Sequence, residues 1–212
     1  MNTKFTETSF CKTESDEIIW CAFRGGDKEA LAILYYRYFK ILIDYGNRIS
    51  HDKALVKDCI HDLFIEIWHS KENLSVPRSV KAYLLICIQR KLNRYLNRKR
   101  IAQVEVNRLP DIQIVDSKED ELISDQHTRD QENAIKAAMG SLTKRQQEAI
   151  YLKFYANLSY AEIVSVMNIS ADAIYNLVSK AIDVMQKKCH VMGHNATPFD
   201  FRDPDIRTLS RN

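Results

Sequence analysis

The stretch from Leu158 to Ala181, LSYAEIVSVMNISADAIYNLVSKA, decides the fold class of this chain. Ser159 and Glu162 have the spacing of a capping box, in which each side chain accepts a hydrogen bond from a free backbone N–H at the helix start. This box predicts a helix over 160–167, and Ser170 can cap a second one over 171–187. The connection between them is short, and its Asn168 tolerates the left-handed conformation of a tight turn. The stretch therefore predicts a helix-turn-helix.

The second of these helices has an apolar face and a polar face. The apolar positions are Ile174, Leu177, Val178, Ala181 and Met185. The opposite positions are Asp172, Asn176, Ser179, Lys180 and Asp183, with Tyr175 at the edge. One buried face and one hydrogen-bonding face are typical of a helix that reads the major groove of DNA. An ordinary helical hairpin with a solvated face explains this segment alone equally well.

Further start and stop positions predict helices along the rest of the chain. Thr143 and Gln146 form a second capping box before a helix over 144–155, and Gly140 ends a helix over 132–139. In the first half, 16–23 reads as a short helix stopped by two glycines. Asp27 and Asp52 can cap longer helices that end near Ile49 and His69. A loop over 70–79 then precedes a helix over 80–100. We expect an all-α protein.

Composition excludes several classes of protein. The chain has 5 glycines and 4 prolines among 212 residues, too few for the turns of a β-sandwich or for a glycine-rich phosphate loop. Its 5 cysteines are scattered and favour a reducing compartment. There is no signal-peptide pattern and no apolar run long enough to span a bilayer. We expect a soluble cytoplasmic protein without membrane insertion.

Charge divides the chain into segments. Residues 81–100 carry seven basic residues and no acid, whereas residues 105–132 carry nine acids and three bases. The acidic stretch has little periodicity and is interpreted as a linker. The expected organisation is a helical domain over 15–100, an acidic linker over 101–131, a helix-turn-helix domain over 132–188 and a tail over 189–212.

Two helices of the first domain carry charged stripes at helical spacing. On 80–100, the expected core positions are Leu85, Ile88, Leu92, Tyr95 and Leu96. The opposite side carries Arg90, Arg94 and Arg98, joined by Lys91 and by an exposed Tyr83, a pattern that suits a phosphate backbone and an unstacked base. On 53–69, the core positions are Val56, Ile60, Leu63, Phe64 and Ile67. The opposite side carries Asp58, Asp62 and Glu66, flanked by His61, Leu55 and Ile65, which suggests a basic protein partner. Solvated faces remain the alternative for both stripes.

Catalytic and metal-binding patterns are weak. Cys189, His190 and His194 lack a second pair of ligands at the spacing of a zinc site. His51, His61 and His69 share no evident acid partner, and no nucleophile motif occurs. We expect no enzymatic activity, no metal and no cofactor.

Three segments together resemble the extracytoplasmic-function (ECF) sigma factors of the sigma-70 family. Residues 58–68, DCIHDLFIEIW, resemble the second conserved region, and 82–100 are similar to the promoter-melting helix. Residues 142–152, 158–163 and 174–181 are similar to the fourth region. This resemblance implies a transcription initiation factor that binds core RNA polymerase and a two-part promoter, with a membrane-bound anti-sigma factor as a further partner.

The resemblance also implies roles for particular residues. Asp58, His61, Asp62 and Glu66 would dock on the clamp helices of the polymerase largest subunit. The loop over 70–79, with Arg78 and Tyr83, would capture a flipped base of the minus-ten element, and Arg90, Lys91, Arg94 and Arg98 would hold the strand. Asp172, Tyr175, Asn176, Ser179 and Lys180 would face the major groove of the minus-thirty-five element.

Three other hypotheses are weaker. A stand-alone helix-turn-helix regulator of duplex DNA has no use for the surface around Tyr83 and Arg98. A helical scaffold that binds only protein leaves both charged stripes as solvated faces. A hydrolase lacks an assembled site.

Overall fold

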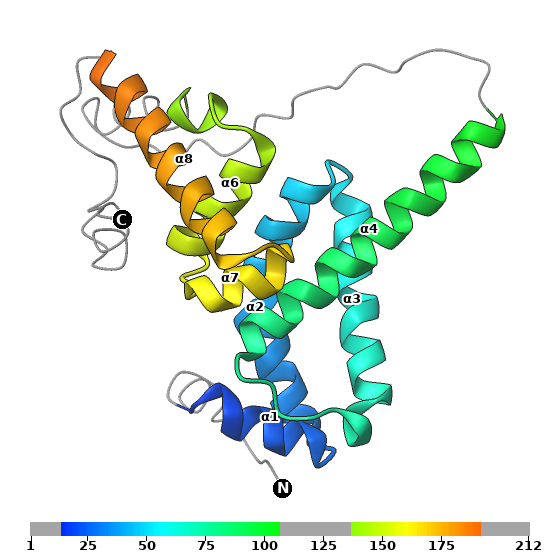
Figure 1. Ribbon diagram of the computed structural model, residues 1–212. Coiled ribbons are helices and arrows are strands. Elements are labelled where there is room, and N and C mark those ends of the chain that lie inside the picture. Colours follow the sequence, from blue (N-terminus) through cyan, green and yellow to red (C-terminus); the bar gives the residue numbers. More distant parts are fainter. Residues whose placement is uncertain (1–13, 107–136, 192–212) are drawn as a thin grey trace, which may run out of the picture. The chain divides into compact units, whose positions relative to one another are not determined.

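The computed structural model describes residues 14–106 and 137–191, and the chain divides after Val106 into two compact units. Every regular element in these residues is a helix (Figure 1), so the predicted all-α class is confirmed. The units are described one at a time, because each has its own core.

The first unit begins with two capped helices. Helix α1 (Asp16–Arg24) starts after Ser15, whose side chain accepts a hydrogen bond from the backbone N–H of Ile18. Helix α2 (Lys28–Ile49) starts after Asp27, whose carboxylate accepts from the N–H of Glu29 at 2.8 Å. Between them, Gly26 has φ +93°, a conformation that glycine adopts without steric cost. The predicted start of α2 is confirmed.

Two more helices complete this unit. Helix α3 (Lys53–His69) is capped by Asp52, as predicted, through the N–H of Leu55 at 3.0 Å. A loop with a short 3₁₀ turn, η2 (Lys71–Asn73), leads to helix α4 (Val80–Val106). Helix α4 ends at Val106 instead of Arg100, so the start of the segment interpreted as linker is helical.

The core of the first unit is apolar and draws on all four helices. Fully buried side chains come from α1 (Trp20, Phe23), α2 (Leu34, Leu42, Tyr45), α3 (Val56, Ile60) and α4 (Leu84, Leu85, Ile88, Leu92). Helices α2 and α3 approach closely at Gly46, where an added Cβ would overlap Val56. Each such side chain contributes about 1.5–3 kcal/mol by leaving water.

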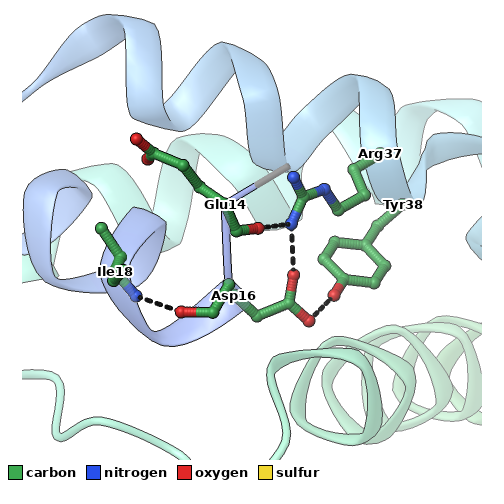
Figure 2. A network of polar contacts seen from close by, with 6 residues as sticks. Glu14, Asp16, Ile18, Arg37 and Tyr38 are labelled. Atoms are coloured by element: carbon green, nitrogen blue, oxygen red, sulfur yellow. Dashed lines mark hydrogen bonds and ion pairs between the residues drawn. The ribbon is translucent and has the colours of Figure 1, made fainter. Parts of the chain in front are cut away.

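A polar network fastens α1 to α2 (Figure 2). The guanidinium of Arg37 donates to the carboxylate of Asp16 at 2.7 Å and to the carbonyl oxygen of Glu14 at 3.1 Å. The hydroxyl of Tyr38 donates to the other carboxylate oxygen of Asp16. Burial and this bond raise the pKa of Tyr38 well above its usual value. The start of α1 is therefore held in place from α2.

The second unit contains the predicted helix-turn-helix. After helical residues 137–140 come α6 (Lys144–Ile150), a π-helical turn η3 (Tyr151–Tyr155), α7 (Tyr160–Met167) and α8 (Ala171–Val191). Both predicted capping boxes are present, and Asn168 ends α7 with φ 52° and ψ 49°. The prediction of one α-helix over 144–155 is wrong in its second half. There the N–H of Ala156 bonds to the carbonyl of Tyr151 at 2.9 Å, a π-type bond that widens the last turn.

Within the two described ranges, no helix has both the length and the apolar character that crossing a membrane requires.

Candidate nucleic-acid interface

A hollow of about 300 Å³ lies between α3 and α4 in the first unit. It is lined by Leu63, Glu66, Ile67, Ser70, Tyr83, Cys87, Arg90, Lys91 and Arg94. Its floor is apolar and its rim carries two exposed arginines, Arg90 and Arg94. A hollow of this kind suits an apolar ring attached to an anionic backbone.

The arginine stripe of α4 lies on the surface, as the helical spacing predicted. Arg90, Arg94 and Arg98 are exposed, while Leu92 between them is fully buried. The prediction that Tyr95 faces the core is wrong, because its side chain is 50% exposed. The C-terminal part of α4 extends away from the rest of this unit (Figure 1), so an apolar side chain there has no neighbouring helix to pack against.

Tyr83 is less accessible than predicted. Its side chain is half-buried, and its ring forms an edge-to-face pair with the Trp20 ring, with centroids 5.4 Å apart. Burial, with a smaller contribution from the Cys87 thiol, raises the pKa of Tyr83 to about 12. Tyr83 forms part of the wall of the hollow, instead of standing free as an exposed stacking platform.

Lys91 does not join the arginine stripe. Its ammonium lies 2.5 Å from a carboxylate oxygen of Glu66 and 3.7 Å from one of Asp62, and its side chain is only 10% exposed. The prediction that Lys91 belongs to an exposed cationic surface is therefore wrong. Its charge faces the carboxylates of α3, which the sequence analysis predicted to bind a partner protein.

The acidic side of α3 is otherwise as the sequence predicted. Asp58, His61, Asp62 and Glu66 are all exposed. Ile65 is 55% exposed, but Leu55, expected beside the stripe, is buried in the core. The His61 ring stacks on Tyr35 of α2, and its Nε2 lies 2.9 Å from the Tyr35 hydroxyl oxygen. Glu66 and Asp62 present their remaining lone pairs to solvent beside Lys91.

An apolar groove beside this stripe was missed by sequence reasoning. It has a volume of about 370 Å³ and is lined by Lys28, Leu31, Phe64, Ile65, Trp68 and His69. Nearby on α2, Tyr36 is 79% exposed and its ring contacts Tyr35. Two adjacent tyrosines on one helix could have indicated an exposed aromatic surface, because a single core face cannot bury both. Exposed aromatic side chains are enriched at protein interfaces.

The loop over 70–79 carries Arg78, which is exposed. The loop is held to α1 by a hydrogen bond from the indole Nε1 of Trp20 to the carbonyl oxygen of Ser75, at 3.1 Å. At the start of the loop, the Lys71 ammonium lies 4.7 Å from the centre of the Trp68 ring. The sequence analysis grouped Arg78 with Tyr83 but did not predict that Trp20 contacts this loop.

In the second unit, α8 presents the predicted polar face. Asp172, Asn176, Ser179, Lys180 and Asp183 are exposed, whereas Ile174, Val178, Ala181 and Met185 are buried. Tyr175 packs on Tyr160 of α7 with ring centroids 4.2 Å apart, and the Lys153 ammonium lies 4.3 Å from the Tyr160 ring centre. The helix thus offers amide, hydroxyl and ammonium groups on a surface fixed by its apolar side.

A metal site is not seen in residues 14–106 and 137–191, which hold no cluster of three potential ligands. The side chains of Cys189, His190 and His194 lie outside the described residues.

Residues 132–183 match the family model for sigma-70 region 4. These residues include the helix-turn-helix with the exposed polar face of α8. This part of the chain is therefore similar to region 4 of the sigma-70 family.

A solved structure shares the fold of this chain. CnrH, solved in complex with the cytosolic domain of CnrY, is 18% identical, with a TM-score of 0.56 over 84% of this chain and 99% of CnrH. The sigma factor RpoE of Bartonella quintana, in complex with the anti-sigma factor NepR, is 19% identical over 74% of this chain and 94% of the other, with a TM-score of 0.49. No curated protein matches the chain by sequence.

Proposed function

We propose that this chain is a sigma factor of the ECF group, which binds core RNA polymerase, directs it to a two-part promoter and assists DNA melting. The observation that carries the proposal is the arginine-rimmed hollow between α3 and α4. A regulator that reads only duplex DNA needs the helix-turn-helix but has no use for this hollow. A single strand, by contrast, exposes bases and backbone together.

The proposed strand-binding surface consists of Tyr83, the arginine stripe and the loop over 70–79. Arg90, Arg94 and Arg98 contact phosphates, and the apolar wall of the hollow with Tyr83 receives an unpaired base of the minus-ten element. Arg78 projects from the loop toward solvent and adds a further cation. Cations at helical spacing match a chain of phosphates without reading its sequence.

The proposed duplex-reading surface is the polar side of α8. Asn176 and Lys180 lie one helical turn apart and provide the groups that bind adenine and guanine edges in the major groove. Ser179 and Tyr175 flank them, and Asp172 at the helix start accepts hydrogen bonds from cytosine amino groups.

The proposed polymerase-binding surface combines the acidic side of α3 with its apolar neighbours. Asp58, His61, Asp62 and Glu66 supply the charge, while Ile65 and the groove at Phe64 supply apolar area. An apolar centre with charges at its margin is the usual composition of a protein interface. The basic clamp helices of the polymerase fit this surface.

A second protein partner is proposed from the fold. CnrH has been solved in complex with a cytosolic domain of CnrY, and the present chain has the same fold. We infer a membrane-bound anti-sigma factor whose cytosolic domain holds this chain in an inactive complex. The proposed setting is the cytoplasm, with no catalytic activity of the chain's own.

Runoff transcription tests the central proposal. The chain is mixed with core polymerase and a pool of linear templates that carry randomised promoter positions, and the transcripts are sequenced. We expect transcripts only when the chain is present, enriched in two short sequence elements. Equal output from core polymerase alone would disprove the proposal.

A further inference from the structure

Trp20 is the buried centre of the contacts between α1 and the loop over 70–79. The indole side chain is fully buried. Its Nε1 donates to the carbonyl oxygen of Ser75, and its ring forms an edge-to-face pair with the ring of Tyr83 in α4, with centroids 5.4 Å apart. Trp20 therefore contacts both the middle of the loop and the first turn of α4.

The loop needs such a contact because little else fixes its path. Residues 74–77 have no regular secondary structure, and Ser75, Val76 and Arg78 are exposed. Hydrogen bonds within the chain hold its two ends, from the N–H of Asn73 to Ser70 and from the N–H of Tyr83 to Ser79. An irregular segment between fixed ends samples several conformations unless a side chain ties its middle.

Trp20 is itself held in a defined place. Its ring packs on Phe23, whose ring contacts Trp68 at the end of α3. The start of α1 is fastened to α2 by the network of Asp16, Arg37 and Tyr38 (Figure 2). Figure 1 shows the loop passing α1 on its way from α3 to α4. A donor held in this way can fix the loop to within the tolerance of a hydrogen bond.

We propose that Trp20 is a positioning residue for base selection at the minus-ten element: its indole N–H and ring set the loop and Tyr83 in the geometry that accepts an unpaired base. This inference rests on the proposed function. Trp20 touches no DNA, and it acts through Ser75 and Tyr83.

The test measures base preference instead of activity alone. Holoenzyme containing Trp20→Phe is given the linear template pool with randomised promoter positions, and its transcripts are sequenced. Loss of the N–H should reduce the preference for the favoured base about three- to tenfold at one or more minus-ten positions, the range of one hydrogen bond. Preference at the minus-thirty-five element should stay unchanged, because the second unit is intact.

Leu42→Val is the matched control. Leu42 is fully buried in α2, and its truncation loosens the same core without touching the loop. This variant should keep the wild-type preference at every position even where total transcription falls. The inference would be overturned if Leu42→Val reduced the minus-ten base preference as much as Trp20→Phe does. It would also be overturned if Trp20→Phe left that preference unchanged. Absence of promoter-dependent transcripts with wild-type chain would instead disprove the proposed function.

A second variant covers the case in which Trp20→Phe loses helical structure. In a Trp68→Phe background, Trp20 is the one remaining tryptophan, because the sequence has 2. Feeding benzothienylalanine then replaces the indole N–H by sulfur with almost the same shape. Loss of minus-ten preference relative to the same background with ordinary tryptophan supports the role of the N–H, and retention of the preference disproves it.

Discussion

Lys91 and Arg94 lie about one turn apart on α4 and line the same hollow, but their surroundings differ. The Lys91 ammonium lies between two carboxylates of α3, and its stem is covered. Arg94 is exposed. The two cations therefore serve different purposes: one joins α3 to α4, and the other is available to a phosphate.

Alanine at each position should separate these two effects. Lys91→Ala should lower the free energy of unfolding by about 1 kcal/mol, since it removes an ion pair and packed methylenes. Arg94→Ala should leave stability within about 0.5 kcal/mol but reduce the salt slope of single-strand binding by about 0.7. Urea unfolding and fluorescence anisotropy at several KCl concentrations measure both. If Lys91→Ala reduced the salt slope of single-strand binding by the same amount, Lys91 would belong to the proposed DNA-binding surface.

Tyr83 should make stability depend on pH in the alkaline range. Its pKa is about 12 in the folded chain, chiefly because of burial, and about 10 in an unfolded chain. Between these values the folded state keeps a proton that the unfolded state has lost, so its stabilising contribution is complete below pH 10 and is lost as pH rises toward 12. The urea midpoint should fall more steeply above pH 10 in wild type than in Tyr83→Phe. Tyr36→Phe, at an exposed position, should behave as wild type, and identical slopes in all three would exclude the burial of Tyr83.

At the scale of elements, the starts of helices could be predicted and the contacts between helices could not. Asp27, Asp52, Thr143 and Ser159 lie within three residues of the N–H groups that they cap, so the sequence alone contains the interaction. The polar face of α8 follows from spacing in the same way. These predictions are confirmed.

Contacts between distant residues explain the errors. Lys91 meets Glu66 across 25 positions, and Trp20 meets Ser75 across 55, so a single-helix projection shows neither. The projection also assigned Tyr95 to the core, because periodicity continues where no neighbouring helix remains. The π-helical turn at Tyr151 could not be predicted either. The capping box before it indicates where the helix begins and says nothing about the hydrogen bonds of its last turn.

The capping box of α7 gives a prediction at this scale. Ser159→Ala removes the acceptor of the Glu162 N–H and should lower the free energy of unfolding of the second unit by about 1 kcal/mol. Ser165→Ala is the control, since its hydroxyl bonds to the carbonyl of Ala161 in mid-helix and caps nothing. Thermal unfolding followed by circular dichroism compares the two. A loss as large in Ser165→Ala would show that general loss of a hydroxyl, and not capping, is the cause.

At the scale of the whole molecule, the two units contain separate cores and separate candidate DNA surfaces. The hollow and the arginine stripe belong to the unit that ends at Val106, and the polar face of α8 belongs to the other. The two surfaces also suit different forms of DNA. Exposed arginines around an apolar hollow favour an opened strand, whereas a helix with a fixed polar face favours an intact major groove.

Separate fragments should therefore retain separate activities. Residues 1–106 and 107–212, expressed apart, should each remain helical and unfold cooperatively, because each unit has its own core. The first should prefer single-stranded DNA and lose that binding in Arg90→Ala/Arg94→Ala. The second should prefer duplex, and neither alone should direct core polymerase to a promoter, since selection needs both elements read on one chain. Circular dichroism and anisotropy with matched single-stranded and duplex oligonucleotides measure this. Loss of helix in either fragment would contradict independent cores, and a preference for duplex in residues 1–106 would remove the hollow as a strand site.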